Sequence, residues 1–141
     1  MNDVLKDGAD YITLSEIDIK MLNPLVWAYI GDSVYEMFVR SYVISDSKKT
    51  SFDLHKRSIK YVKASAQSAH LEIIAPHLSE EESDIVRRGR NSKAAHLPKN
   101  ANVIDYRRAT AFEALIGYLY LLKRHERLAE IIALVLKPQD K

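Results

Sequence analysis

Apolar residues recur at helical spacing over a long stretch of this 141-residue chain, beginning directly after Asn23-Pro24. Asn is a favoured helix N-cap and Pro is favoured at the first helical position, so this pattern predicts one helix over about residues 24–44. The sequence contains four glycines and four prolines, a small number that favours long helices over many short strands and turns. We therefore expect an all-α helical bundle that forms a single domain.

Composition excludes several classes of protein. The chain has no cysteine, which excludes disulfides, cysteine-ligated metal centres and thiol catalysis. Charged or polar residues interrupt every apolar run before the roughly 20 residues that a membrane span requires. The first 25 residues also lack the basic start and apolar core of an export signal, so we expect a cytoplasmic protein.

Capping boxes predict where two further helices begin. Thr50 is followed three residues later by Asp53, which predicts a helix that ends before the next proline. Ser79 and Glu82 repeat the pattern, and we expect Gly89 to end the short helix that they open.

The last third of the chain predicts a loop and two helices. Residues 89–104 lack apolar periodicity and are rich in loop-forming residues. We expect Asp105 to cap a helix that runs to about residue 123, and a final helix to cover about residues 126–137. The expected organisation is an N-terminal segment, a helical domain and a short tail, over residues 1–21, 22–137 and 138–141.

Positive charge is concentrated between residues 87 and 108. This segment holds seven Lys or Arg residues against one acid, Asp105, whereas residues 1–22 are acidic. Such a segment can be a solvated face, or it can contact the phosphates of a nucleic acid. The candidate RNA-binding residues are Arg87, Arg88, Arg90, Lys93, Lys99, Arg107 and Arg108.

Two glycines lie inside helical patterns, and each has an acid nearby. Asp32 follows Gly31, and Glu113 lies one turn before Gly117. A glycine inside a helix costs about 1 kcal/mol relative to Ala, so a close approach of another helix or of a ligand is expected at both positions. The two acids are candidates for one shared cation site, although exposure or ion pairing would also explain each of them.

The residues around these acids resemble two motifs of the ribonuclease III family. Residues 28–36, AYIGDSVYE, resemble its signature helix, and residues 112–121, FEALIGYLYL, resemble its second acidic motif. Ala28 and Thr110 stand where standard members carry two further acids. The Mini-III branch typically lacks these two acids. Its members also typically end where a double-stranded-RNA-binding domain would begin, as this chain does. The resemblance covers about residues 22–136.

The resemblance implies a magnesium-dependent endoribonuclease that cuts double-stranded or structured RNA and leaves 5′-phosphates. It implies a ribosomal RNA precursor (23S) as the substrate, and Asp32 and Glu113 as the catalytic residues and the Mg²⁺ ligands. Two carboxylates suffice for Mg²⁺, which keeps several waters and binds substrate phosphate. The resemblance also implies a homodimer that forms through the helix over residues 24–44, with Trp27 and Tyr29 as interface candidates.

Two other functions remain open at this point. The missing acids at Ala28 and Thr110 allow a catalytically silent domain that only binds RNA. The acidic run Glu80-Glu81-Glu82 with Asp84 allows an all-α nucleotide pyrophosphohydrolase, although a capping box explains these acids more simply.

Overall fold

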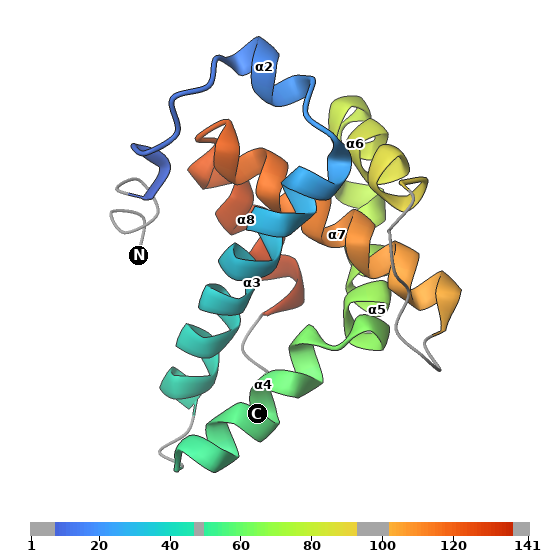
Figure 1. The fold of residues 1–141 in the computed structure, drawn as a ribbon. Helices are drawn as coiled ribbons and strands as arrows, with labels where there is room; N and C mark the ends of the chain where they lie inside the picture. Colours follow the sequence, from blue (N-terminus) through green and yellow to red (C-terminus); the bar gives the residue numbers. More distant parts are fainter. Residues whose placement is uncertain (1–7, 47–49, 93–101, 137–141) are drawn as a thin grey trace.

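The computed structural model describes residues 8–46, 50–92 and 102–136, and within these ranges it contains helices and no strand. The helices are α2 (Glu16–Lys20), α3 (Pro24–Asp46), α4 (Ser51–Val62), α5 (Ala64–Ile74), the 3-10 helix η1 (Ala75–His77), α6 (Glu80–Arg90), α7 (Val103–Leu121) and α8 (His125–Val135) (Figure 1). The all-α expectation is confirmed. Within the described residues, the helices are too short or too polar to span a membrane.

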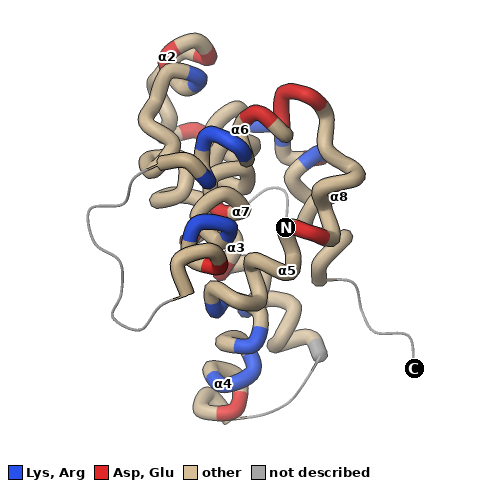
Figure 2. The backbone as a smooth tube through the Cα atoms, turned by 90° about the vertical axis from the view of Figure 1, so that its right-hand side faces the viewer, with Lys and Arg blue, Asp and Glu red and all other residues tan. Residues whose placement is uncertain are grey.

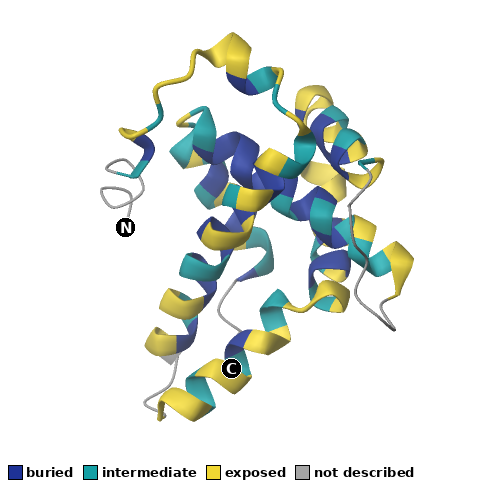
Figure 3. Ribbon diagram, viewed as in Figure 1, coloured by how far each residue is buried: buried dark blue, intermediate teal, exposed yellow. Residues whose placement is uncertain are grey.

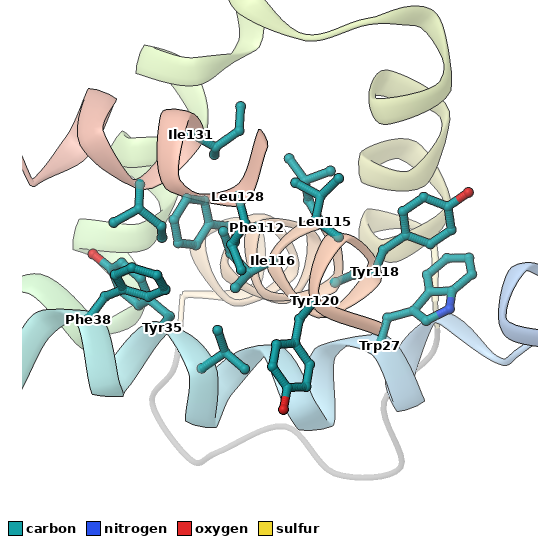
Figure 4. Close-up of a cluster of buried hydrophobic side chains, with 14 of the residues drawn as sticks. Trp27, Tyr35, Phe38, Phe112, Leu115, Ile116, Tyr118, Tyr120, Leu128 and Ile131 are labelled. Carbon is teal, nitrogen blue, oxygen red and sulfur yellow. The ribbon is translucent and has the colours of Figure 1, made fainter. Parts of the chain in front are cut away.

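α7 is the central helix of the bundle. Most of its residues from 109 to 120 are buried, and the buried positions lie all around the helix, as expected for a helix that other helices enclose. α3, α5, α6 and α8 pack against it, and Figure 3 shows the buried residues gathered along their contacts. The close-up in Figure 4 shows the core side chains of α3, α7 and α8 around this axis.

α3 and α7 cross at a pair of glycines, Gly31 and Gly117. A Cβ atom on Gly31 would lie 2.8 Å from the backbone nitrogen of Gly117 and even closer to the carbonyl oxygen of Glu113. A Cβ atom on Gly117 would lie 2.7 Å from the carbonyl carbon of Trp27. The two backbones therefore touch where no side chain can intervene, which confirms the close approach expected from the sequence.

Local capping signals place several helix starts correctly. The side chain of Thr50 accepts a hydrogen bond from the backbone N–H of Asp53, and Ser79 and Glu82 form a reciprocal capping box. The first long helix begins at Pro24 as expected.

Three expectations about helix boundaries were wrong. The predicted single helix after Thr50 is broken at Lys63, whose backbone is extended (φ −65°, ψ 156°). Gly89 does not end α6, because it lies inside the helix and a Cβ there would sit 2.9 Å from the Cβ of Ala114. The N-cap of α7 is Asn102 rather than Asp105, since the Asn102 side chain accepts from the Asp105 N–H.

Candidate active site

The glycine crossing brings Asp32 and Glu113 together. Asp32 follows Gly31 on α3, and the backbone of Gly31 lies against the carbonyl of Glu113 on α7. The Asp32 carboxylate lies near enough to Glu113 to raise its pKa. Asp32 is exposed at the surface, whereas Glu113 is half-buried. The pair expected from two distant motifs is therefore one cluster, with one carboxylate facing solvent and one half-buried.

Burial raises the pKa of Glu113 to about 8, and the nearby Asp32 carboxylate and the charge of Glu36 add to this effect. A hydrogen bond from Gln67 acts in the opposite direction and lowers this pKa. The two charged neighbours that raise the pKa of Glu113, Asp32 and Glu36, are both acidic. Such a cluster favours a bound cation, because two carboxylates that share one site repel each other when both are ionised.

Gln67 of α5 is the site residue that sequence reasoning missed. Its Nε2 donates to Oε2 of Glu113 (3.1 Å) and to the carbonyl of Val62 (2.8 Å). A single Gln in α5 carries no local signal of such a contact, because the contact joins positions 46 residues apart.

The two positions that lack the additional acids are occupied by structural residues. Ala28 is buried in α3, and the Thr110 hydroxyl donates to the carbonyl of Tyr106 one turn earlier in α7 (3.0 Å). This bond is the one expected of a Thr inside a helix. Within the described residues no group of three or more His, Cys, Asp or Glu side chains is arranged to hold a metal. Asp32 and Glu113 are the two carboxylates that the α3–α7 crossing brings together.

The candidate RNA-binding residues that the structure describes lie on helices rather than on a loop. Arg87, Arg88 and Arg90 belong to the last turn of α6, and Arg107 and Arg108 belong to the first turns of α7 (Figure 2). Lys93 and Lys99 fall outside the described residues.

The contacts of these arginines divide them into two kinds. Arg87, Arg90 and Arg108 line a groove of about 520 Å³ between α5, α6 and α7. Arg87 pairs with Asp84 one turn earlier, and Arg108 lies 3.7 Å from Glu72. Both pairs are partly exposed, and such pairs are weak, so these guanidinium groups remain available to a phosphate. The side chain of Arg88 instead stacks 4.8 Å from the ring of Trp27.

The two expected interface aromatics lie in different environments. Trp27 is 0% exposed, its Nε1 donates to the carbonyl of Ile19 (2.9 Å), and its ring meets the edge of Tyr118 at 5.1 Å. It is a core residue with no surface to offer a second subunit, so its assignment to an interface is corrected. Tyr29 is 80% exposed.

The acidic run of α6 makes structural contacts. Glu82 caps its own helix and is bound by Arg127 of α8 at 2.8 Å. Glu81 accepts a hydrogen bond from Tyr118 and pairs with Arg124. These contacts explain Glu81 and Glu82 without a second cation site.

The raised pKa of Glu113 predicts a pH-dependent stability of the metal-free protein. The unfolded chain loses this proton near the ordinary pKa of 4.5, whereas the folded protein holds it until about pH 8. The folded state therefore binds more protons in this window, and the free energy of unfolding falls as pH rises through it. We expect Glu113→Gln to stabilise the protein at pH 8 by about 4 kcal/mol and to have little effect near pH 4.5.

Urea unfolding in a chelating buffer at pH 5 and pH 8 measures this effect. The difference between parent and variant isolates Glu113 from other titrating groups, such as His70, whose pKa burial lowers. Glu126→Gln, at an exposed position of α8, is the matched control. Equal pH dependence in the parent and in Glu113→Gln would contradict the expectation.

Comparison with known proteins finds one family. The model of the ribonuclease III domain matches residues 25–124, which include both carboxylates. The Mini-ribonuclease 3 of Clostridium tetani is 54% identical over 120 residues, covering 84% of this chain and 80% of that protein. The Mini-ribonuclease 3 of Staphylococcus aureus is 45% identical over 116 residues, covering 81% and 87%. A crystal structure of a Fusobacterium nucleatum protein is 35% identical, with a TM-score of 0.76, covering 85% of this chain and 96% of that one.

Proposed function

We propose that this chain, which belongs to the Mini-ribonuclease 3 branch of the ribonuclease III family, hydrolyses double-stranded or structured RNA with Mg²⁺ at Asp32 and Glu113. The chain is an endoribonuclease, like the members of this branch. The observation that carries this proposal is the meeting of these two carboxylates at the α3–α7 crossing. The proposed products carry 5′-phosphates and 3′-hydroxyls.

The donor set fits a hard divalent cation. Mg²⁺ takes oxygen ligands, needs one or two carboxylates, and leaves its other positions to water and substrate phosphate. Asp32 and Glu113 would hold it. A bound divalent cation polarises a phosphate oxygen and makes water a stronger nucleophile near neutral pH.

Residues of the protein orient the metal-binding carboxylate and the attacking water. Glu113 is half-buried and held by the Gln67 amide, so its carboxylate has a defined position. Asp32 faces solvent and is the carboxylate that an approaching phosphate meets first. It is placed to orient the attacking water by accepting a hydrogen bond from it.

The choice of substrate distinguishes this proposal from a silent RNA-binding domain and from a nucleotide pyrophosphohydrolase. The protein is incubated with Mg²⁺ and, separately, with long double-stranded RNA, single-stranded RNA and nucleoside triphosphates. We expect the duplex to be cut and the triphosphates to remain intact. Binding of the duplex without cleavage would favour the silent RNA-binding domain, and release of pyrophosphate would favour the pyrophosphohydrolase.

The arginines of α6 and α7 are the proposed RNA contacts. Arg87, Arg90 and Arg108 line one groove at the α5–α7 seam, and the Gln67–Glu113 contact lies on the same seam. Arg107, which directly precedes Arg108 in α7, is exposed, whereas Arg88 stacks on Trp27. Phosphate contacts of this kind bind A-form RNA through its backbone with little base specificity.

Replacing Arg87 and Arg90 with Ala should weaken RNA binding and flatten its salt dependence. Each lost phosphate contact removes about one unit or less from the slope of log affinity against log salt, so we expect a decrease of about 1 to 2 units. The measurement is duplex binding in a chelating buffer at several salt concentrations. Lys123→Asn is the control, since it removes a positive charge at the other end of α7 and Asn tolerates the positive φ of 60° there. An unchanged slope of log affinity against log salt in the arginine variant would show that Arg87 and Arg90 lie on a solvated face and do not contact the RNA.

A homodimer and a ribosomal RNA precursor are the further parts of the proposal. The outer face of α3 exposes apolar side chains, among them Tyr29 and Ile44, and a shallow groove with Met37 lies between them. Four polar side chains also line this groove: Ser33, Glu36, Arg40 and Ser41. Such a mixture of apolar and polar side chains is typical of protein–protein association surfaces. A two-fold dimer through α3 would pair two sites and cut both strands of a duplex. Maturation of a 23S ribosomal RNA precursor would take place in the cytoplasm.

Tyr29→Asp tests the dimer. A carboxylate placed in an apolar contact loses its hydration, so we expect the variant to be a folded monomer with duplex cleavage reduced at least about tenfold. Light scattering reports the mass, and circular dichroism reports the fold. Tyr29→Phe, which keeps the ring, is expected to remain dimeric. A Tyr29→Asp protein that is still a dimer with normal activity would place the interface elsewhere.

A further inference from the structure

Gln67 is a polar residue in a core position. It lies in the middle of α5 and is 2% exposed. Burying an amide costs free energy unless its polar atoms are hydrogen-bonded. Its Oε1 has no partner within the described part of the chain. A Met or Leu would fill the same space without this cost, so packing does not explain a Gln here.

The orientation of the Gln67 amide follows from its neighbours. Nε2 lies 2.8 Å from the Val62 carbonyl and 3.1 Å from Oε2 of Glu113. Both neighbours are acceptors when the carboxylate is ionised, so the nitrogen must face them. Both N–H groups are then used, one for each acceptor.

The Val62 carbonyl is available to Gln67 because the chain turns at Lys63. The extended backbone of Lys63 ends α4, so carbonyls of the last turn of α4 lack their helical partners. The Gln67 side chain satisfies the Val62 carbonyl from α5. The amide is therefore anchored to the α4–α5 junction on one side and holds the Glu113 carboxylate on the other.

We propose that Gln67 is a positioning residue of the active site, whose side-chain amide fixes the Glu113 carboxylate for the divalent cation. This inference rests on the proposed magnesium site. One carboxylate oxygen of Glu113 is engaged by Gln67, which limits rotation of the group and directs the other oxygen away from α5. Partners that orient a metal ligand in this way typically change metal affinity or activity by 10- to 100-fold when they are removed.

Gln67→Met tests the proposal through metal binding itself. The readout is the dissociation constant for Mn²⁺, measured by electron paramagnetic resonance on the folded, RNA-free protein. We expect it to increase at least about tenfold, with a similar fall in kcat and with duplex affinity in a chelating buffer unchanged within twofold. Ser68→Ala is the matched control, because Ser68 is the next buried polar residue of α5. Mn²⁺ affinity within twofold of the parent in Gln67→Met would overturn the proposal.

A second measurement uses the unaltered protein and does not depend on how the variant folds. The chain contains two glutamines, Gln67 and Gln139, so selective labelling with ¹⁵N-glutamine gives two side-chain amide signals, which a Gln139→Glu variant distinguishes. We expect the Gln67 signal to shift during a Mg²⁺ titration, along the same binding curve as the backbone signals of Asp32 and Glu113 in a uniformly ¹⁵N-labelled sample. If those backbone signals shift and the Gln67 amide does not, the positioning role is wrong. If none of them shifts, the magnesium site itself is wrong.

Discussion

Asp32→Asn and Glu113→Gln are each expected to abolish duplex cleavage while the fold and RNA binding persist. Each substitution keeps the shape of the side chain and removes the negative charge that a hard cation requires. A cation at the reacting phosphate contributes several kcal/mol of transition-state stabilisation, which corresponds to a loss of roughly a thousandfold or more in rate. RNA binding should survive because the proposed phosphate contacts come from α6 and α7 rather than from the carboxylates.

Cleavage of a long duplex at saturating Mg²⁺ measures the activity, and gel-shift binding in a chelating buffer measures the affinity. Glu126→Gln is the control, since it removes an exposed acid of α8 that does not belong to the site. Substantial cleavage by either site variant at saturating Mg²⁺ is incompatible with the proposed roles of Asp32 and Glu113.

Gly117→Ala and Gly31→Ala should each destabilise the fold by about 3 kcal/mol or more, or prevent folding. An added methyl group on Gly117 would lie 2.7 Å from the Trp27 carbonyl carbon and 2.9 Å from Cγ2 of Ile30. The nearest atoms at both glycines are backbone atoms, which move only if α3 and α7 separate. Separation would open the core along the central helix, which is costlier than a typical overpacking change of 1 to 3 kcal/mol. It would also move Asp32 away from Glu113.

Thermal and urea unfolding of the variants measure this cost. Gly89→Ala is the milder substitution used for comparison, because a methyl group there would meet the Cβ of Ala114 at 2.9 Å and would contact no backbone carbonyl at closer range. It should be clearly less destabilising than Gly117→Ala, and the higher helix propensity of Ala offsets part of its cost. A Gly117→Ala protein as stable as the parent would show that the two helices can separate freely.

Several features were predictable because their causes are local. The start of α3 at Asn23-Pro24 and the capping box of Ser79 and Glu82 depend on bonds within one turn, so neighbouring residues suffice to identify them. The pair of Asp32 and Glu113 was predictable for a related reason. A glycine inside an apolar helix has a cost that only a close contact offsets, and each acid lies within one turn of such a glycine.

Other features depended on contacts between distant elements, which no local pattern encodes. Trp27 and Tyr29 are two residues apart on one helix, yet α7 and α2 bury the first and leave the second exposed. Gly89 resembles a helix stop, but it stays within α6 because α7 passes too close for a side chain. Gln67 reaches Glu113 because the chain turns at Lys63. The sequence alone therefore determined the all-α class, the starts of α3, α4 and α6, and the two acids beside the glycines. The packing around α7 decided the other helix boundaries and which side chains face the site, since burial and hydrogen bonding between helices arise only when the helices are assembled.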